Sequence, residues 1–342
     1  MKIWCLCLAL ALACGGCKKS ATAPKGSASD ESTKDTSPVT LTVKWPVGNR
    51  YSERMEMNGA TETTMPQMPK PMQQKVQVTQ EYSITVLGER PKGGRELELK
   101  FESTEIDVTM NGKPVLNLDT KGEAGAGEAS NPIASTFRQV IGARIKFLLD
   151  ASNQVEKVEG YKEFVAKATA GGNPQSRAIM QNMFSEDYFQ QMVDFARGLP
   201  RQPVNVGESW PFQTHLNVPV LGVMKMDLTY TFSGWEQREK RKCAAIDFTG
   251  TMTSKSPSNA APMGMTSKVE SGQISGKTWF DPELGNPVET LINQDLVIHM
   301  TVPSPRAQRT NAASQAAASQ NLTNRTKQKI VIKLADVVSA AK

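Results

Sequence analysis

The chain has 342 residues, of which 40 are Lys or Arg and 34 are Asp or Glu, and its net charge at pH 7 is +6. Hydrophobic residues make up 39% and aromatic residues 6%, a composition that excludes wholesale disorder, collagen, a coiled coil and a protein with many membrane spans. The small basic excess forms no stripe with interleaved aromatic residues, so we expect no nucleic-acid partner. A chain of this length can bury one sizeable core or two small ones.

An export signal is predicted at the N-terminus. Lys2 is followed by an apolar run from Ile3 to Ala13, which is too short for a membrane span of about 20 residues but suits a signal peptide. Small residues then precede Cys14 and Cys17. This arrangement resembles a bacterial lipoprotein signal, in which the cysteine after the small residues is diacylated. Three interpretations stay open: lipidation at Cys17, lipidation at Cys14, and an ordinary secretory signal cleaved after Ala13.

The expected lipid would hold the protein to a membrane of the bacterial cell envelope. Burial of acyl chains contributes about 0.8 kcal/mol per methylene group, so a cysteine with two or three chains is anchored permanently. In lipoproteins of this kind, Asp after the lipidated Cys favours the inner membrane, and here that residue is Gly15 or Lys18. We therefore expect an outer-membrane anchor facing the periplasm, with the lipoprotein signal at residues 1–16 and a disordered tether at residues 17–40.

Cysteine usage predicts a body without disulfide bonds. Cys5 and Cys7 leave with the signal, and one of the two later candidates carries the lipid, so Cys243 is the cysteine left in the body. It lies on an expected strand with no His nearby in the sequence. We interpret Cys243 as a packed thiol rather than a nucleophile.

The body is predicted to be α+β and predominantly antiparallel β. Apolar residues alternate with polar ones in several segments, a period of two that predicts strands with one wet face. In the first of these segments, Gln80 is the one polar residue on the apolar side. The segments are residues 76–86, 97–101, 106–110, 224–232 and 330–334.

Local sequence signals predict one irregularity within a strand and one tight turn. The alternation changes phase near Ser103, which indicates a bulge or a bend. Asn111-Gly112 predicts a tight hairpin, because both central positions of a type I′ turn need a positive φ.

Helices are predicted in the middle of the chain. Residues 161–170 and 175–183 form two short ones, and a third begins after Ser185, a good N-cap, and ends near Gly198. We expect two tandem curved sheets with these central helices packed on their concave faces. The corresponding units are a first antiparallel β unit at 41–160, a helical segment at 161–200 and a second antiparallel β unit at 201–342.

The two β units resemble diverged copies of one another. Val-Gly-Asn-Arg-Tyr at 47–51 is similar to Val-Gly-Glu-Ser-Trp at 206–210, and the apolar positions of 82–88 match those of 228–234. This similarity predicts that the two units share a fold. Solvated polar loops are expected at 121–130, 253–266 and 306–325.

Four motifs punctuate the body. They are Val-Gly-x-x-Tyr at Val47–Tyr51, a Met/Pro-rich loop at Met65–Met72, Gly-x-x-Trp at Gly207–Trp210 and a Trp-Phe-Asp-Pro-Glu-Leu-Gly hairpin at Trp279–Gly285. The pattern resembles a family of uncharacterised exported bacterial lipoproteins, a domain of unknown function, over residues 41–338. That resemblance implies no activity. The last hairpin also resembles one in the lipoprotein-carrier fold, which implies a curved antiparallel sheet with helices on its concave side.

Signatures of catalysis are missing from the sequence. It contains no nucleophile elbow, phosphate-binding loop or paired-histidine zinc motif. Of its two histidines, His215 lies near a strand, and His299 shares a strand face with Asp295 but lies about 13 Å from it along the strand. We interpret these as solvated strand residues, and we expect no enzymatic activity and no cofactor. A hydrolase without a recognisable motif is the alternative.

Methionine is the unusual residue, with 16 copies. Met65, Met68 and Met72 lie within eight residues, and Met263 and Met265 form a second pair. Soft thioethers select Cu(I), so one hypothesis is a periplasmic copper-handling protein that uses this loop. The other interpretation is a hydrophobic loop over an apolar rim, which methionine suits, and it implies no metal.

The remaining candidate is the basic run Arg238–Lys242 between two strands. We interpret it as a solvated turn, with attraction to anionic headgroups as the alternative. The sequence as a whole favours a non-enzymatic, lipid-anchored envelope protein. Its partners would be the membrane, through the N-terminal lipid, and an apolar small molecule or an envelope protein.

Overall fold

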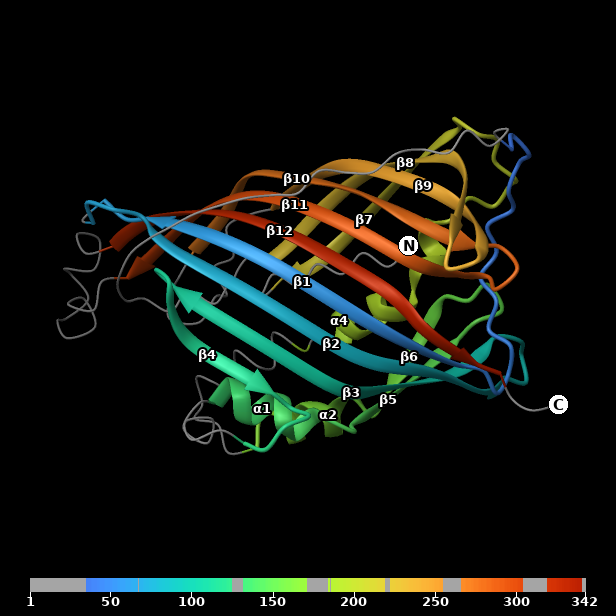
Figure 1. The fold of residues 1–342 in the computed structure, drawn as a ribbon, viewed down its shortest axis with the longest axis horizontal. Helices are drawn as coiled ribbons and strands as arrows, with labels where there is room; N and C mark the ends of the chain where they lie inside the picture. Colours follow the sequence, from blue (N-terminus) through green and yellow to red (C-terminus); the bar gives the residue numbers. More distant parts are fainter. Residues whose placement is uncertain are drawn as a thin grey trace.

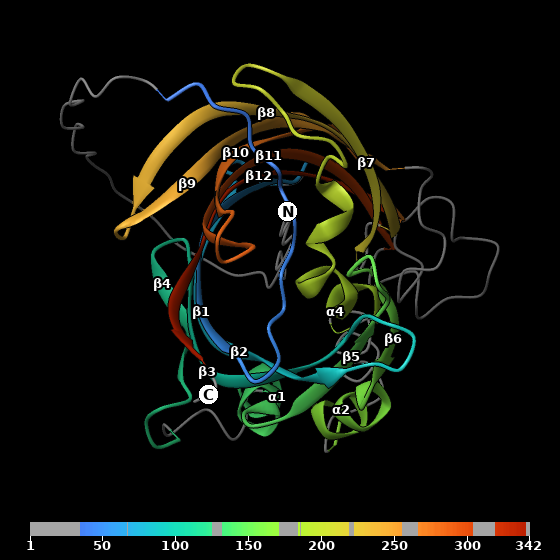
Figure 2. The same ribbon diagram turned by 90° about the vertical axis from the view of Figure 1, so that its right-hand side faces the viewer.

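The computed structural model describes residues 35–66, 68–124, 132–170, 184, 186–218, 222–254, 266–303 and 319–339. Within these ranges, twelve strands form one antiparallel sheet in the order β6-β5-β3-β2-β1-β12-β11-β10-β9-β8-β7, with β4 paired to β3. Figure 1 shows the long diagonal strands, and Figure 2 shows how the sheet curls. The first-half strands are β1 (Arg50–Thr64), β2 (Met72–Glu89), β3 (Arg95–Met110), β4 (Lys113–Asp119), β5 (Arg144–Leu149) and β6 (Val155–Glu159). The second-half strands are β7 (Ser209–Val218), β8 (Gly222–Arg238), β9 (Arg241–Ser254), β10 (Thr266–Asp281), β11 (Asn286–Pro303) and β12 (Ser319–Val338).

The predicted antiparallel class is confirmed, but the two expected sheets are joined into one. The first strand, β1, pairs along its whole length with the last strand, β12, from Arg50 opposite Val338 to Thr64 opposite Thr323. This seam satisfies the backbone groups of two strands that would otherwise be free edges. It also corrects the expected loop at 306–325, because β12 already begins at Ser319.

The predicted similarity of the two halves appears in their hydrogen bonds. The amide of Gly48 donates to the carbonyl of Val86 at 2.8 Å, and the amide of Gly207 donates to the carbonyl of Phe232 at 2.7 Å. Both glycines have positive φ, 84° and 88°. The strand register shifts after Val86 in one half and after Phe232 in the other. Both halves therefore begin with the same turn locked to the same strand position.

The predicted bulge and the predicted tight turn are both confirmed. The pairing of β2 with β3 shifts by one residue between Ser103 and Phe101, which is the expected bulge. Asn111 and Gly112 have φ values of 48° and 81° and connect β3 to β4. The bulge keeps the apolar residues on both sides of it on one face of the sheet.

Two of the short helices contact the inner face of the curl. Phe164 and Phe189 both contact Phe101, an inner-face residue of β3, with ring centroids 5.6 Å and 6.3 Å away. Figure 2 shows the helix that carries Phe189 inside the curl, near β7 and β6. The helices are α1 (Pro132–Val140), α2 (Tyr161–Ala168), α4 (Glu186–Val193) and the 3₁₀ helix η2 (Phe195–Gly198).

The helix predictions are confirmed where the structure describes them, except that the third is divided into α4 and the 3₁₀ helix η2. The predicted helix at 161–170 is α2, whereas the one at 175–183 and the N-cap Ser185 lie outside the described residues. Helix α1 was not predicted from the sequence. In the described ranges, every helix is too short or too polar to cross a bilayer.

One end of the curl is covered by residues 35–49, which we call the strap. Val39, Leu41, Val43 and Trp45 alternate with exposed residues and are buried. Val39 exchanges backbone hydrogen bonds with Val204, at 2.9 Å and 3.0 Å. Figure 2 shows the strap in blue, crossing the open end of the sheet from β8 towards β2. Residues 35–40 were assigned to the tether from the sequence, but in the structure Val39 is buried and Asp35 pairs with Lys242 of the body.

At Gly276 on the inner face, the absence of a side chain lets neighbouring groups pack closely. A Cβ atom at Gly276 would lie 2.0 Å from the carbonyl oxygen of Leu291 and 2.4 Å from Cζ of Phe248. The Phe248 ring therefore occupies the space that a side chain would take. At Gly88, by contrast, nothing lies within 4 Å of such an atom.

These two glycines give a matched test of the curl. Gly276→Ala should lower the free energy of unfolding by about 2 kcal/mol or more, because the methyl group must displace backbone and an aromatic ring. Gly88→Ala should change it by less than about 1 kcal/mol. Urea unfolding of the two variants measures both values, and equal losses would contradict the close packing at Gly276.

Candidate functional site

The inner face of the curled sheet contributes its apolar side chains to one continuous cluster of buried residues in the described chain. Period-two alternation directs one set of side chains from each strand to this face. Val78, Met57, Ile330 and Ile292 form one cross-strand row on β2, β1, β12 and β11, and all four are buried. The row continues beyond Gly276 to Phe248 on β9.

Methionine is concentrated on buried surfaces of this body. Its side chain is unbranched and adaptable, so it can pack against apolar groups of different shapes. The high methionine content thus belongs chiefly to the inner face and the residues that cover it. The buried methionines are Met55, Met57, Met72, Met110, Met192, Met224, Met226, Met252 and Met300.

Towards the end of the strands far from the strap, the inner face becomes polar. Seven uncharged side chains on four neighbouring strands form what we call the polar strip. Two of its members, Thr61 and Thr326, lie opposite one another with their hydroxyl oxygens 3.0 Å apart. The strip consists of Thr61, Thr63, Gln74, Gln294, Asn324, Thr326 and Gln328.

Two amide oxygens of the polar strip are buried without a hydrogen-bond donor. They are Oδ1 of Asn324 and Oε1 of Gln328, and the two residues are 5% and 6% exposed. The amide nitrogen of Asn324 donates to Sδ of Met300 at 3.2 Å. Leaving a buried carbonyl unpaired costs about 1–3 kcal/mol, so these oxygens favour a donor.

A buried carboxylate lies between the apolar row and the strap. The hydroxyl of Tyr82 donates to Oε2 of Glu53 at 2.5 Å, and both residues are buried on the inner face. Strand register places them side by side on β2 and β1. This charged group has its own hydrogen bond and is separate from the polar strip.

The strap end is packed with aromatic rings. The ring of Trp45 lies 5.2 Å from that of Tyr51 and 5.9 Å from that of Phe195. Next to Phe195, the buried carboxylate of Asp194 pairs with Nε of Arg197 at 2.7 Å. Burial raises the pKa of Asp194 to about 6 despite this ion pair.

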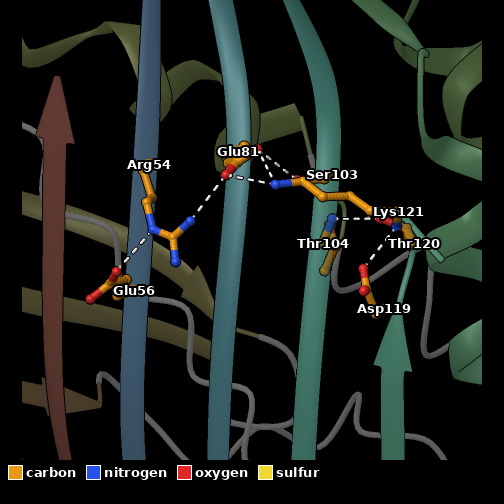
Figure 3. A network of polar contacts seen from close by, with 8 residues as sticks. All are labelled: Arg54, Glu56, Glu81, Ser103, Thr104, Asp119, Thr120 and Lys121. Carbon is orange, nitrogen blue, oxygen red and sulfur yellow. Dashed lines mark hydrogen bonds and ion pairs between the residues drawn. The ribbon is translucent and has the colours of Figure 1, made fainter. Parts of the chain in front are cut away.

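The outer face carries ion-pair networks that hold neighbouring strands together. Figure 3 shows the one centred on Glu81 of β2, which pairs with Arg54 of β1 at 3.0 Å and with Lys121 at 2.9 Å. Ser103 of β3 donates to the same carboxylate at 3.0 Å. The hydrogen bond from Lys121 is the main cause that lowers the pKa of Glu81. The network links three strands and the segment after β4, which is a structural role.

A groove of about 990 Å³ also crosses the outer face. Its charged side chains largely compensate one another, as in the pair of Lys327 and Asp295 at 3.5 Å. Such a lining can hydrogen-bond water or a polar partner. Amide and hydroxyl groups of Asn58, Gln77, Thr249, Gln273, Ser275 and Asn293 make up much of it.

The two histidines lie on the outer surface. Nε2 of His299 lies 2.8 Å from Glu270, and its Nδ1 lies 3.1 Å from the hydroxyl of Thr323. Asp295 pairs with Lys327 instead. His215 is exposed on β7, opposite Lys225. The interpretation of both as solvated strand residues agrees with these positions.

Cys243 is free and buried, as expected for a packed thiol. Burial, with a smaller contribution from Asp281, raises its pKa to about 12, so the unreactive thiol form persists at neutral pH. The basic run 238–242 forms the β8–β9 turn, where Arg241 pairs with Asp281 and Lys242 with Asp35.

The methionine loop is split between two environments. Met72 is 6% exposed and opens β2 on the inner face, opposite Thr63, whereas Met68 is 44% exposed in the turn with Met65. Met263 and Met265 lie outside the described residues. In the ranges that are described, no cluster of three His, Cys, Asp or Glu side chains could hold a metal ion. A copper site at this loop stays a hypothesis.

Two parts of this site were missed in the sequence. The strap has a clear period-two signal in Val39, Leu41, Val43 and Trp45, but it lies at the junction with a polar segment. The polar strip gives no hydropathy signal, because its amides and hydroxyls are typical of a wet face. Gln80, noted as an interruption of the apolar side, is indeed buried on the inner face.

Asp194 makes the stability of the strap end depend on pH. Its folded pKa of about 6 exceeds the ordinary value of 3.8, so the folded state binds this proton more tightly. The free energy of unfolding should therefore fall as the pH rises from about 4 to about 6, and then level off. Asp194→Asn should remove this slope and raise the free energy of unfolding at pH 7.5 by up to about 3 kcal/mol.

Urea unfolding at pH 4, 5, 6 and 7.5 measures this effect. Asp295→Asn is the control, because that carboxylate is half exposed, 51%, and should leave the pH profile unchanged. An unchanged profile for Asp194→Asn would contradict the assigned burial of the charge.

Residues 92–285, more than half of the chain, match a family of unknown function designated DUF6263, as the resemblance in the sequence implied. No curated protein matches the chain. A structure describing lipid–protein interactions in lipovitellin has a TM-score of 0.40 and 10% identity, and covers 87% of this chain and 26% of that one. The chain thus spans about a quarter of the length of lipovitellin.

Two bacterial structures are more distant. A domain described as an outer membrane lipoprotein-sorting protein from Vibrio parahaemolyticus has a TM-score of 0.15 and 8% identity, and covers 84% of this chain and 85% of that one. Pseudomonas aeruginosa OccK11 (OpdR) has a TM-score of 0.20 and 9% identity, and covers 86% of this chain and 99% of that one. All these scores lie below 0.5, so none of them informs on function. The match over residues 92–285 shows that the chain belongs to the family of unknown function DUF6263.

Proposed function

We propose that this protein is a lipid-anchored envelope protein whose inner sheet face binds an apolar ligand. The observation that carries the proposal is the single curled sheet with one apolar inner face, rich in adaptable methionines. Apolar ligands are bound in concave, mostly apolar surroundings with few polar groups. The proposal assigns no catalytic step to any residue.

The expected lipid anchor supports the same function. The strap begins at Asp35, 18 residues after Cys17, and a tether of that length, disordered as the sequence predicts, would have a root-mean-square span of about 25 Å. A lipid on Cys17 or Cys14 would keep the body this close to a membrane surface. An apolar ligand drawn from that membrane would then have a short path to the protein.

Ligand binding can be tested by filling the inner face. Leu296 is buried on the inner side of β11, and its neighbour Val297 points to the outer side. The full chain is purified in amphipol and titrated with N-phenyl-1-naphthylamine, which fluoresces in apolar surroundings. Leu296→Trp should weaken binding by about tenfold or more by occupying ligand space, whereas Val297→Trp should leave it unchanged.

A second variant guards against misfolding of the first. Ile298→Phe adds a smaller volume to the same face of β11 and should also weaken binding. Thermal unfolding of each variant establishes that it is folded. Absence of binding by the wild-type chain, or equal binding by all four proteins, would refute the proposed apolar site.

The anchor has a separate test. Replacing both Cys14 and Cys17 by Ser should abolish labelling with an alkyne analogue of palmitate and release the protein from membranes, because no acceptor thiol remains in the signal. Cys243→Ala is the matched control and should retain full labelling. The two single variants identify the modified cysteine. Label that persists in the double variant would show that the protein is not lipidated at either position.

A further inference from the structure

The polar strip gives the inner face a second chemistry that a purely apolar ligand would leave unused. We infer that it recognises the head of a neutral amphiphile, one with hydroxyl or amide N–H groups attached to an acyl chain. This inference rests on the proposed function, because the chain of the ligand would lie on the apolar part of the same face.

The missing hydrogen bonds of the polar strip all call for donors on the ligand. The unpartnered atoms Oδ1 of Asn324 and Oε1 of Gln328 are acceptors, and both residues lie on the inner side of β12. They are two rows apart on one strand, so they span about 13 Å of the face. A ligand that satisfies both must present hydrogen-bond donors, as hydroxyl or amide groups do.

The polar strip offers no charged group to a ligand. All seven of its members are uncharged, and the buried carboxylate of Glu53, which accepts from Tyr82, lies beyond the apolar row, towards the strap. A charged head brought into this buried region would lose its hydration without gaining an opposite charge from the strip. The strip therefore favours a neutral head over a phosphate, a carboxylate or a sulfate.

The polar strip and the strap lie at opposite ends of the inner face. The strap and the aromatic rings around Trp45 cover one end. Next to them lies the buried pair of Glu53 and Tyr82, and the apolar row of Met57 and Ile330 separates this pair from the strip. The tail of the amphiphile would lie on this row, with its head at the strip.

The test compares ligands that share one chain and differ in the head. The full chain in amphipol is loaded with N-phenyl-1-naphthylamine, and displacement is measured with 1-monooleoylglycerol, methyl oleate and oleyl sulfate. The monoglyceride should displace the probe at about 10- to 100-fold lower concentration than methyl oleate, because each hydrogen bond contributes about tenfold. Oleyl sulfate should be as weak as methyl oleate or weaker.

Variants then place the preference on the strip. Asn324→Leu combined with Gln328→Leu should bring the monoglyceride to the level of methyl oleate and leave methyl oleate itself unchanged. The matched control, Asn58→Leu with Gln77→Leu, removes the same two residue types from the outer face, where they hydrogen-bond one another at 3.1 Å. It should retain the full preference.

The outcomes separate this inference from the function on which it rests. If the double variant does not fold, Asn324→Leu and Gln328→Met singly should each reduce the preference by about tenfold. Equal displacement by all three ligands with wild type would overturn the head recognition and leave apolar binding intact. A preference for oleyl sulfate would overturn the neutral head. Failure of wild type to bind the probe at all would refute the proposed function itself.

Discussion

Burial of one inner face is the constraint on which this structure depends. A curled sheet of twelve strands has a single inner side, and hydrophobic burial of that side drives its folding. Strand pairing sets which residues reach it: Met57, Ile330 and Ile292 share a row only because β1, β12 and β11 are in register. The helices and the strap cover the same face and bury their own apolar residues against it. Outer-face ion pairs such as that of Glu81 and Lys121 add local links between strands.

The type of side chain on the inner face changes from one end of the strands to the other. Aromatic rings around Trp45 cover one end, aliphatic and methionine side chains fill the middle, and amides such as Gln328 lie towards the other end. A core that served stability alone would gain nothing from buried amides whose oxygens lack donors. The proposed amphiphile, with an apolar part and a polar part, matches this variation along the face.

Much of the fold could be predicted because its signals are local. Period-two alternation identifies β2, β3, β8 and β12, and the phase change at Ser103 and the Asn111-Gly112 pair identify a bulge and a turn. The seam could not be predicted, because no local pattern says that Arg50 faces Val338. The polar strip was missed for a different reason: a buried amide and an exposed one have the same hydropathy, and only the register of the neighbouring strands distinguishes them.

The seam also sets the order in which the molecule can be completed. Arg50 and Val338 are 288 positions apart in the chain, so the contact that unites the sheet carries a large loop-closure cost and should form late. At a synthesis rate of about 5–20 residues per second, β12 is made roughly 15–60 seconds after β1. During that interval one side of β1 is an unpaired edge, open to pairing with other chains. The synthesis of β12 is therefore the step that closes this edge.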